Sequence, residues 1–450
     1  MRHTRARAAK ALLAFATVAA TAAVTACAHT PDARRVGPHA AGTLPGIQYL
    51  SIAPGPGTMN AGTTNGINVT AENGGKVTGV TVSTSGDKVT GTLNAMHTSW
   101  HSSWALNNDT RYTVTAHGTD ARGHPVTTTS TFTTQNPKNT FHTEIFQGYN
   151  QTYGVGMPVM LTFSQPIKDK AAVERALTLT TSTPVVGAWY WDGDERAYFR
   201  PRDYWPAGTT VSLDARLNGV DAGDGLYGAA DLTQTFNIGQ SVIAVASTAT
   251  HHTQVYVDGK LRYNWPISTG RDTMPTPDGT YLTVEKGNPV RMIGGKKGTP
   301  GYYNELVNYA VRFTFSGDYY HAAPWSVVNQ GYSNVSHGCV NLSPGDAKTY
   351  YQMAVPGDPV TIAGSPKGGK WDNGWTPWFY DWSQYLAGSA THMAVEADPD
   401  GSRLVSPSAV PTDTATAPIG TSAPGNYLSA GLRVPGDGRR LCDVRGMRGG

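Results

Sequence analysis

Residues 336–341 read Ser336-His337-Gly338-Cys339-Val340-Asn341, and a second histidine, His321, stands eighteen residues before the cysteine. A nucleophilic cysteine needs a base within hydrogen-bond reach and donors for the negative oxygen that develops during attack. This short stretch contains residue types for each of these roles. The chain has only three cysteines in 450 residues, so a cysteine flanked by histidine predicts a reactive thiol.

The segment around this stretch, residues 239–365, has the pattern of a mainly β domain. Asp258-Gly259 stands between two alternating runs and is the signature of a tight hairpin. Ser343-Pro344 predicts the start of one clear helix, with serine as the N-cap and proline at the first helical position, and the helix should end before Pro356. The predicted strands are residues 253–257, 260–263, 311–315, 327–329 and 359–362.

Two segments precede this domain, residues 44–136 and 137–238. With 52 glycines and 29 prolines in 450 residues, the chain is poor in helix signals and too long for a single core. Both segments consist of short strand-like runs separated by turn clusters such as 73–75 and 85–87. This pattern predicts two β-sandwiches in tandem.

The amino terminus predicts export. Basic residues are followed by an apolar run, 11–26, that is too short to span a bilayer, so residues 1–26 form a signal peptide. The run ends in Val24-Thr25-Ala26-Cys27, which resembles a bacterial lipobox. Cleavage before Cys27 and attachment of a diacylglyceryl group to its thiol would anchor the chain to the outer face of the cell membrane, with residues 27–43 as a flexible stalk. The alternative is an ordinary secretory signal with Cys27 as a passenger.

The carboxyl-terminal part divides into an aromatic and a low-complexity segment. Residues 366–390 are rich in tryptophan. They could form a platform for stacking glycans, but we expect a flap that packs on the catalytic domain and the second sandwich. Residues 391–450 are rich in Ser, Thr, Ala, Pro and Gly, which predicts a disordered tail. The chain is mildly basic, with a net charge of +3 and a pI near 8.6. Its Lys and Arg residues do not form a cluster, so we do not expect it to bind nucleic acid.

The catalytic segment resembles the L,D-transpeptidases, the YkuD-type enzymes that cross-link peptidoglycan. Their motif is a histidine, about 14 to 17 residues, and then Ser/Thr-His-Gly-Cys, a hydrophobic residue and Asn. His321 and residues 336–341 match it. Ser268-Thr269-Gly270 and Thr276-Pro277-Asp278-Gly279 resemble supporting elements of the family. The two sandwiches resemble the immunoglobulin-like domains of the multi-domain actinobacterial members, so that the resemblance covers residues 43–390.

The resemblance implies a role for each residue of the motif. Cys339 would be the nucleophile and His321 its base, while His337 would shape the loop and help to hold the donor peptide. The N–H groups of Gly338 and Cys339 and the hydroxyl of Tyr303 would form the oxyanion hole. Ser336 and Asn341 would fix the loop and, with Tyr303 and His337, bind substrate. Trp325 would line the pocket or belong to the core. Ala322 stands where serine is common in the family; the change is harmless if His321 is oriented by a backbone carbonyl.

The reaction that the resemblance implies is acyl transfer without a metal or an organic cofactor. Cys339 attacks the L-centre carbonyl at position three of a tetrapeptide stem and releases D-alanine. The side-chain amine of a neighbouring diaminopimelate then captures the thioester, which gives a 3→3 cross-link. Carbapenems should acylate the same cysteine, because their β-lactam carbonyl imitates the donor. The expected partners are thus peptidoglycan stems, the membrane and carbapenem inhibitors.

Four alternatives compete with this reading. Water in place of the acceptor amine would make the enzyme an L,D-carboxypeptidase. His321, His337 and Cys339 could instead be zinc ligands, although no fourth ligand has convincing spacing. A sortase-like transpeptidase also uses Cys and His, but no matching Arg-bearing strand is evident. A non-catalytic wall-binding lipoprotein would leave the Cys/His pattern without a purpose.

Overall fold

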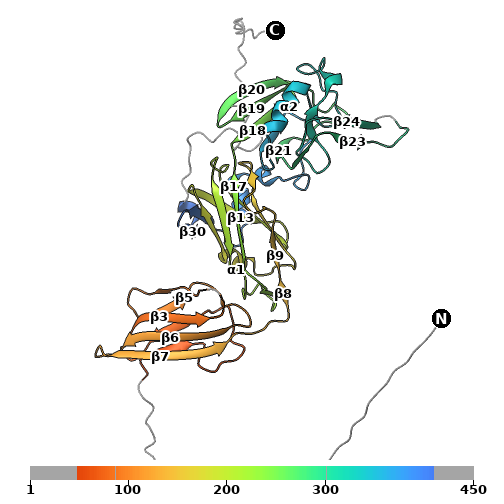
Figure 1. Cartoon of the computed structure of the whole chain (residues 1–450). Coiled ribbons are helices and arrows are strands. Elements are labelled where there is room, and N and C mark those ends of the chain that lie inside the picture. Colours follow the sequence, from red (N-terminus) through yellow and green to blue (C-terminus); the bar gives the residue numbers. More distant parts are fainter. Residues whose placement is uncertain (1–47, 87, 300–301, 410–450) are drawn as a thin grey trace, which may run out of the picture. The chain divides into compact units, whose positions relative to one another are not determined.

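The computed structural model describes residues 48–86, 88–299 and 302–409, and Cys27 with the predicted signal and stalk lies outside them. This part of the chain is mainly β, as predicted, with short helices (Figure 1). None of the helices within residues 48–409 is long and apolar enough to cross a membrane.

The first sandwich has two sheets whose alternating inward residues form one core. Tyr112, Val114 and Ala116 of one strand are buried at every second position, and Tyr112 stacks on Phe132 with ring centroids 5.5 Å apart. One sheet contains β1 (Leu50–Ala53), β2 (Asn68–Ala71), β5 (Ser99–Ser102) and β4 (Gly91–Leu93); the other contains β3 (Lys76–Thr84), β6 (Arg111–Thr119) and β7 (Pro125–Thr133).

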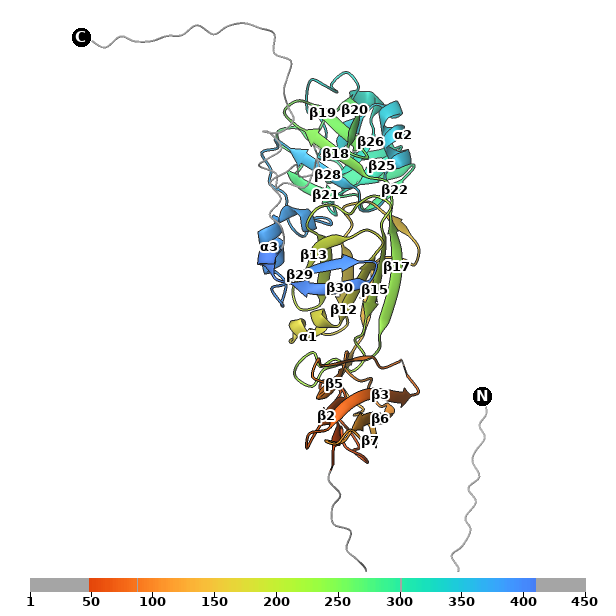
Figure 2. The ribbon, with the colours of Figure 1, turned by 90° about the vertical axis from the view of Figure 1, so that its left-hand side faces the viewer.

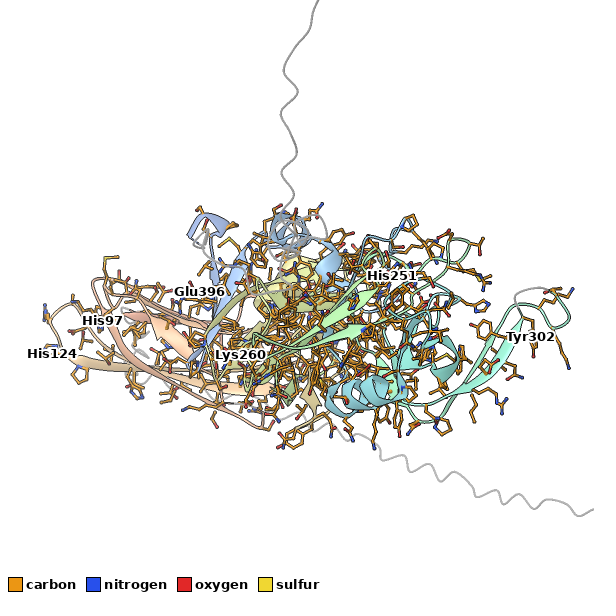
Figure 3. All side chains as sticks on the ribbon, turned by 90° about the horizontal axis from the view of Figure 1, so that it is seen from above. His97, His124, His251, Lys260, Tyr302 and Glu396 are labelled. Atoms are coloured by element: carbon orange, nitrogen blue, oxygen red, sulfur yellow. The ribbon has the colours of Figure 1, made fainter. Side chains whose placement is uncertain are left out.

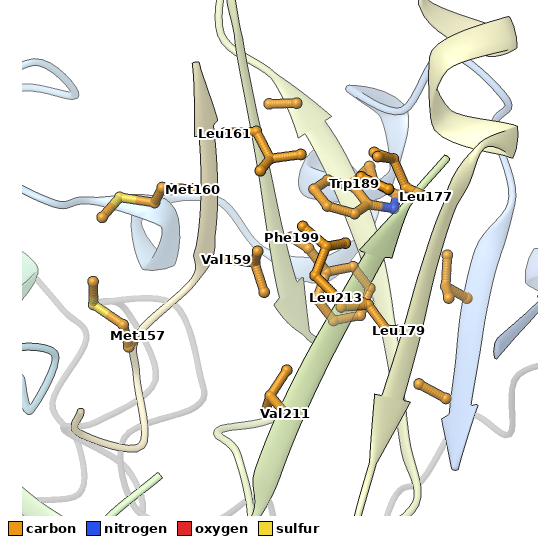
Figure 4. Close-up of a cluster of buried hydrophobic side chains, with 14 of the residues drawn as sticks. Met157, Val159, Met160, Leu161, Leu177, Leu179, Trp189, Phe199, Val211 and Leu213 are labelled. Carbon is orange, nitrogen blue, oxygen red and sulfur yellow. The ribbon is translucent and has the colours of Figure 1, made fainter. Parts of the chain in front are cut away.

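The second sandwich packs large aromatic and aliphatic side chains between its sheets. Figure 4 shows Leu161, Trp189 and Phe199 from one sheet meeting Leu213 from the other, all almost fully buried. One sheet contains β10 (Thr152–Tyr153), β17 (Leu232–Ile238), β15 (Thr210–Ala215) and β12 (Leu177–Thr181). The other contains β30 (Gly401–Val405), β29 (Ala394–Asp398), β13 (Val185–Trp191), β14 (Arg196–Pro201), β11 (Val159–Phe163) and β9 (Thr143–Ile145). Also in this part are α1 (Lys170–Arg175) and the pair β8 (Thr140–Phe141) and β16 (Tyr227–Gly228).

The prediction of disorder from residue 391 onward is wrong for residues 391–409. β29 pairs with β13 of the second sandwich, β30 pairs with β29, and η3 (Pro407–Ala409) follows. The buried carboxylate of Glu174 accepts hydrogen bonds from Ala390 N, Thr391 N and the hydroxyls of Ser389 and Thr391 at 2.7–3.1 Å. The local composition of residues 391–409 cannot reveal this interaction, because Glu174 lies more than two hundred residues earlier in the chain. Residues 410–450 lie outside the described part.

The aromatic segment 366–390 packs as a flap, as expected. It contains η2 (Pro377–Phe379) and α3 (Trp382–Ala387). Buried Trp378 donates to Gly156 O at 2.8 Å, and Phe379 packs edge-on against Tyr281. The guanidinium of Arg200 lies over the Trp378 ring at 4.3 Å. These contacts connect the segment both to the second sandwich and to the catalytic domain.

The catalytic domain combines two sheets, one hairpin and one main helix. A five-stranded sheet has the order β20 (Lys260–Pro266), β19 (His252–Val257), β18 (Val242–Ser247), β28 (Pro359–Ala363) and β21 (Gly279–Leu282). A four-stranded sheet has the order β22 (Glu285–Gly287), β25 (Ala310–Arg312), β26 (Tyr319–Ala322) and β27 (Val340–Leu342). The hairpin pairs β23 (Val290–Gly294) with β24 (Tyr303–Val307), and Tyr302 is labelled near its free end in Figure 3.

The predicted helix and hairpin are confirmed, whereas one predicted strand is wrong. α2 (Pro344–Met353) begins after Ser343, whose hydroxyl accepts from Asp346 N at 3.2 Å, and lies beside β25 and β26 (Figure 2). β19 and β20 form the hairpin around Asp258-Gly259. Residues 327–329 do not form a strand, because η1 (Pro324–Ser326) continues into a turn in which Ser326 O accepts from Asn329 N.

Candidate active site

A cavity of about 420 Å³ opens beside Cys339. Seven of the residues predicted for the site line it: Tyr303, His321, Trp325, Ser336, His337, Cys339 and Asn341. Met292, Glu305, Val307 and Val335 complete the lining. The structure therefore brings together residues from the β23–β24 hairpin, β26, η1, the loop before β27 and β27 itself.

Parallel pairing of β26 with β27 places the histidine next to the strand that the cysteine precedes. In the register of these strands, Tyr320 stands opposite Val340 and His321 opposite Asn341. Cys339 directly precedes β27, and its sulfur accepts a hydrogen bond from Tyr319 N–H. The residues between the two strands serve as the crossover that a parallel pair requires.

The ring of His321 is held in one orientation. It is buried and its Nδ1 lies 2.9 Å from Ala322 O. Because a carbonyl oxygen only accepts, Nδ1 carries the proton and Nε2 keeps a free lone pair. Burial also lowers the pKa of His321 below its usual value, which favours the neutral ring. The ring is thus oriented by the backbone carbonyl of residue 322, for which an alanine side chain is sufficient.

Cys339 rests as a thiol. Burial raises its pKa to about 12, the nearby charge of Asp318 acts in the same direction, and the hydrogen bond from Tyr319 N–H opposes them. Sγ donates to Gly317 O over a long 3.8 Å contact. A thiol with such a pKa needs a base at the moment of attack, rather than a pre-formed thiolate.

Ser336 orders the loop that presents the cysteine. Its hydroxyl donates to Cys339 O at 2.6 Å and accepts from Gly338 N at 3.1 Å. This differs from the oxyanion role predicted for Gly338, since its N–H is already engaged within the loop and Gly338 does not line the cavity. The glycine itself is required here, because its φ is +138° and a Cβ would collide with Asp318 Oδ1.

The rings of Tyr303 and His337 lie against each other in a tilted arrangement in the cavity wall. Their ring centroids are 4.6 Å apart. Arg271 Nη1 donates to His337 Nε2 at 3.0 Å, which requires Nδ1 to carry the proton of a neutral ring. Partial burial and the charge of Arg271 lower the pKa of His337. Burial, with the charges of Cys339 and Asp318, raises the pKa of Tyr303, so its hydroxyl remains a donor at neutral pH.

Asn341 and Trp325 take different positions in the cavity wall. Asn341 is buried, its Nδ2 donates to Ser326 Oγ at 3.1 Å and its backbone N donates to Ser268 O. It therefore braces η1 as well as lining the cavity. Trp325 is 55% exposed, with its ring centroid 6.1 Å from that of His321. Of the two predicted places for Trp325, the structure shows the pocket wall and not the core.

Three charged residues at or near the site were missed: Glu305 in the cavity wall, Arg271 and Asp318. Arg271 directly follows Ser268-Thr269-Gly270, and its position after a supporting motif was the available signal. Asp318 lies three residues before His321, in a turn that no periodic pattern marks. Thr276, from the other supporting motif, donates to Gly338 O at 2.7 Å and so ties that motif to the catalytic loop.

Among the residues that the structure describes, no group of three or more His, Cys, Asp or Glu side chains is arranged to hold a metal ion. His321, His337 and Cys339 share one cavity, but they do not form such a group.

Comparison with known proteins agrees with the domain order. Residues 241–362 match the model of the L,D-transpeptidase catalytic domain, and residues 58–221 match that of a bacterial Ig domain. L,D-transpeptidase 5 of Mycobacterium tuberculosis is 39% identical over 298 residues, which are 63% of this chain and 64% of that protein. The aligned part thus spans just under two thirds of that relative.

L,D-transpeptidase 2 of the same species is 34% identical over 332 residues, which are 72% of this chain and 80% of the relative. A crystal structure of L,D-transpeptidase 3 from Mycobacterium tuberculosis, in complex with a faropenem-derived adduct, is 33% identical and covers 49% of this chain and 96% of its own, with a TM-score of 0.40. By its match to the catalytic-domain model and to relatives over most of their length, this chain belongs to the L,D-transpeptidase family.

Proposed function

We propose that this protein forms 3→3 cross-links in peptidoglycan through a thioester on Cys339. The observation that carries the proposal is the presence of a protonated thiol and a neutral, carbonyl-oriented His321 in the wall of one cavity. Membership of the family and the order of the domains support it.

In the first half-reaction, His321 Nε2 takes the thiol proton as Sγ attacks the carbonyl of the L-centre at position three of the donor stem. The oxygen of the tetrahedral intermediate becomes negative. Tyr303 OH and Cys339 N–H are the donors that remain for it, because Gly338 N–H is engaged by Ser336. When the intermediate collapses, the C–N bond breaks, D-alanine leaves with the proton from His321, and the thioester remains.

In the second half-reaction, the side-chain amine of a neighbouring diaminopimelate attacks the thioester. The C–N bond forms, the C–S bond breaks, and the thiol is restored. The same first step predicts acylation by carbapenems, since the strained β-lactam carbonyl offers an equivalent electrophile to Sγ.

We also propose that the chain is exported and acts in the cell wall, anchored to the membrane through acylated Cys27. Mass spectrometry of the mature protein would find two ester-linked acyl chains on residue 27. Its amino group would be either free or joined to a third acyl chain by an amide bond. The Cys27→Ala variant should move from the membrane to the soluble fraction; wild-type protein in the soluble fraction would contradict the anchor.

Incubation of the full chain with a disaccharide-tetrapeptide, followed by mass spectrometry, tests the main proposal. A dimer that has lost one D-alanine, absent with Cys339→Ala, is the expected product. Monomeric tripeptide alone would assign an L,D-carboxypeptidase instead. No product, together with an unmodified Cys339 after carbapenem treatment, would refute catalysis and favour a wall-binding protein.

A further inference from the structure

A carboxylate that the two half-reactions do not use lies against the catalytic loop. Asp318 is in the turn between β25 and β26, and its Oδ1 occupies the place that a Cβ on Gly338 would need. Its neighbours Gly317 and Tyr319 both contact the sulfur of Cys339, through Gly317 O and Tyr319 N–H. The segment 317–319 therefore runs past the reacting atom.

Hydrogen bonds fix this carboxylate in one orientation. Thr314 Oγ1 donates to Asp318 Oδ2 at 2.7 Å, and Ser316 Oγ donates to the same oxygen at 3.2 Å. Ser316 is held in turn by Asn373, whose Nδ2 donates to its hydroxyl at 3.0 Å. Both bonds to the carboxylate end on Oδ2, which leaves Oδ1 directed at the catalytic loop.

The negative charge of Asp318 is not neutralised nearby. Within residues 48–86, 88–299 and 302–409, no lysine, arginine or histidine makes an ion pair with it. The residue is partly exposed. A negative charge beside Cys339 also raises the pKa of the thiol and thus opposes acylation. An acid at this place is a disadvantage for the first half-reaction.

The sulfur has two sides. One side faces the cavity that His321 and Trp325 line. The other side faces the segment 317–319, and none of the residues of this segment lines that cavity. Once a donor stem occupies the cavity as a thioester, a second substrate has to approach from elsewhere. The amine that must arrive there is a cation in its protonated form.

We propose that Asp318 binds the protonated side-chain amine of the acceptor stem and brings it to the thioester from the Gly317 side of the sulfur. This proposal rests on the transpeptidation proposed above and makes Asp318 a specificity residue that favours aminolysis over hydrolysis. The ammonium gives one proton to water; the neutral amine forms the C–N bond and gives a second proton to His321 Nε2. The C–S bond breaks, and the thiolate takes that proton back.

The test separates the two half-reactions in the full chain. Acylation by a carbapenem is followed by intact mass, and the ratio of cross-linked dimer to hydrolysed tripeptide is measured with a disaccharide-tetrapeptide. In Asp318→Asn, acylation should be as fast as in wild type or faster, because the opposing charge is gone. The dimer-to-tripeptide ratio should fall roughly fivefold, the effect of losing one partly exposed ion pair. Asp318→Glu should keep much of the ratio, and Asp272→Asn, which removes an exposed charge of the same domain, should keep all of it.

Each other outcome overturns the proposal. If acylation and the ratio fall together, Asp318 has a structural role only. If Asp318→Asn forms dimer and tripeptide in the wild-type ratio, the acceptor binds elsewhere while the cross-linking function stands. If wild type becomes acylated but gives no dimer, both the cross-linking function and the role of Asp318 fail.

Discussion

Replacement of Ser336 by alanine tests whether the catalytic loop must be held in place for acylation. The hydroxyl makes two hydrogen bonds inside the loop, to Cys339 O at 2.6 Å and from Gly338 N at 3.1 Å. The side chain is only 7% exposed, so water cannot easily replace it. A hydrogen bond of this kind contributes about 1 kcal/mol. Loss of both therefore weakens the active arrangement of the loop by about 2 kcal/mol.

About 2 kcal/mol corresponds to roughly a 30-fold slower acylation. The rate is measured as the appearance of the carbapenem adduct by intact mass at a fixed inhibitor concentration. Ser333→Ala is the matched control, because Ser333 lies in the same crossover but its hydroxyl accepts only from Asn329 Nδ2, at 3.1 Å. Ser336→Ala with an acylation rate within twofold of wild type would refute the reasoning, because the loop would then hold its shape without the hydroxyl.

Two further predictions concern pH and stability. Because burial lowers the pKa of His321, its neutral form persists at pH values below the usual pKa of about 6.5. The acylation rate should therefore rise with pH only below about 6.5 and then stay level until the thiol itself ionises. A rise in rate with its midpoint above about pH 7 would contradict this. Glu174→Gln replaces a buried acceptor by an amide whose N–H faces the donors of Ser389, Ala390 and Thr391. We expect the free energy of unfolding, measured by urea denaturation, to fall by about 3 kcal/mol. Glu144→Gln, at an exposed position, should leave it unchanged. Equal urea midpoints for the two variants would show that Glu174 does not hold this segment.

The sequence predicted His321, Ser336, His337, Cys339 and Asn341 in the cavity wall because their motif is local. His321 lies on β26, and residues 336–341 form the end of the loop before β27 and the start of β27, its parallel neighbour, so that their spacing is a direct consequence of one crossover. The helix after Ser343 was predictable for the same reason, since its cap and its first-turn proline are neighbours in the chain. Local patterns of this kind need no knowledge of distant partners.

What the sequence did not predict depends on distant or backbone-level contacts. The contact of Arg271 with His337 joins residues 66 positions apart. The engagement of Gly338 N–H is a matter of loop geometry that no residue pattern encodes. The strand prediction at 327–329 failed because β-type side chains there follow Pro324, which starts a turn of 3₁₀ helix instead.

The return of the chain to the second sandwich has a consequence for synthesis and for truncation. β29 completes its sheet by pairing with β13, although residues of the whole catalytic domain lie between them in the chain. During synthesis on the ribosome, the second sandwich therefore cannot complete its sheet until the catalytic domain, which precedes β29 and β30 in the chain, has been made. A protein shortened at residue 390 would leave the backbone of β13 as a free edge, open to pairing with another chain. Expression for crystallography or screening should therefore extend at least to residue 409.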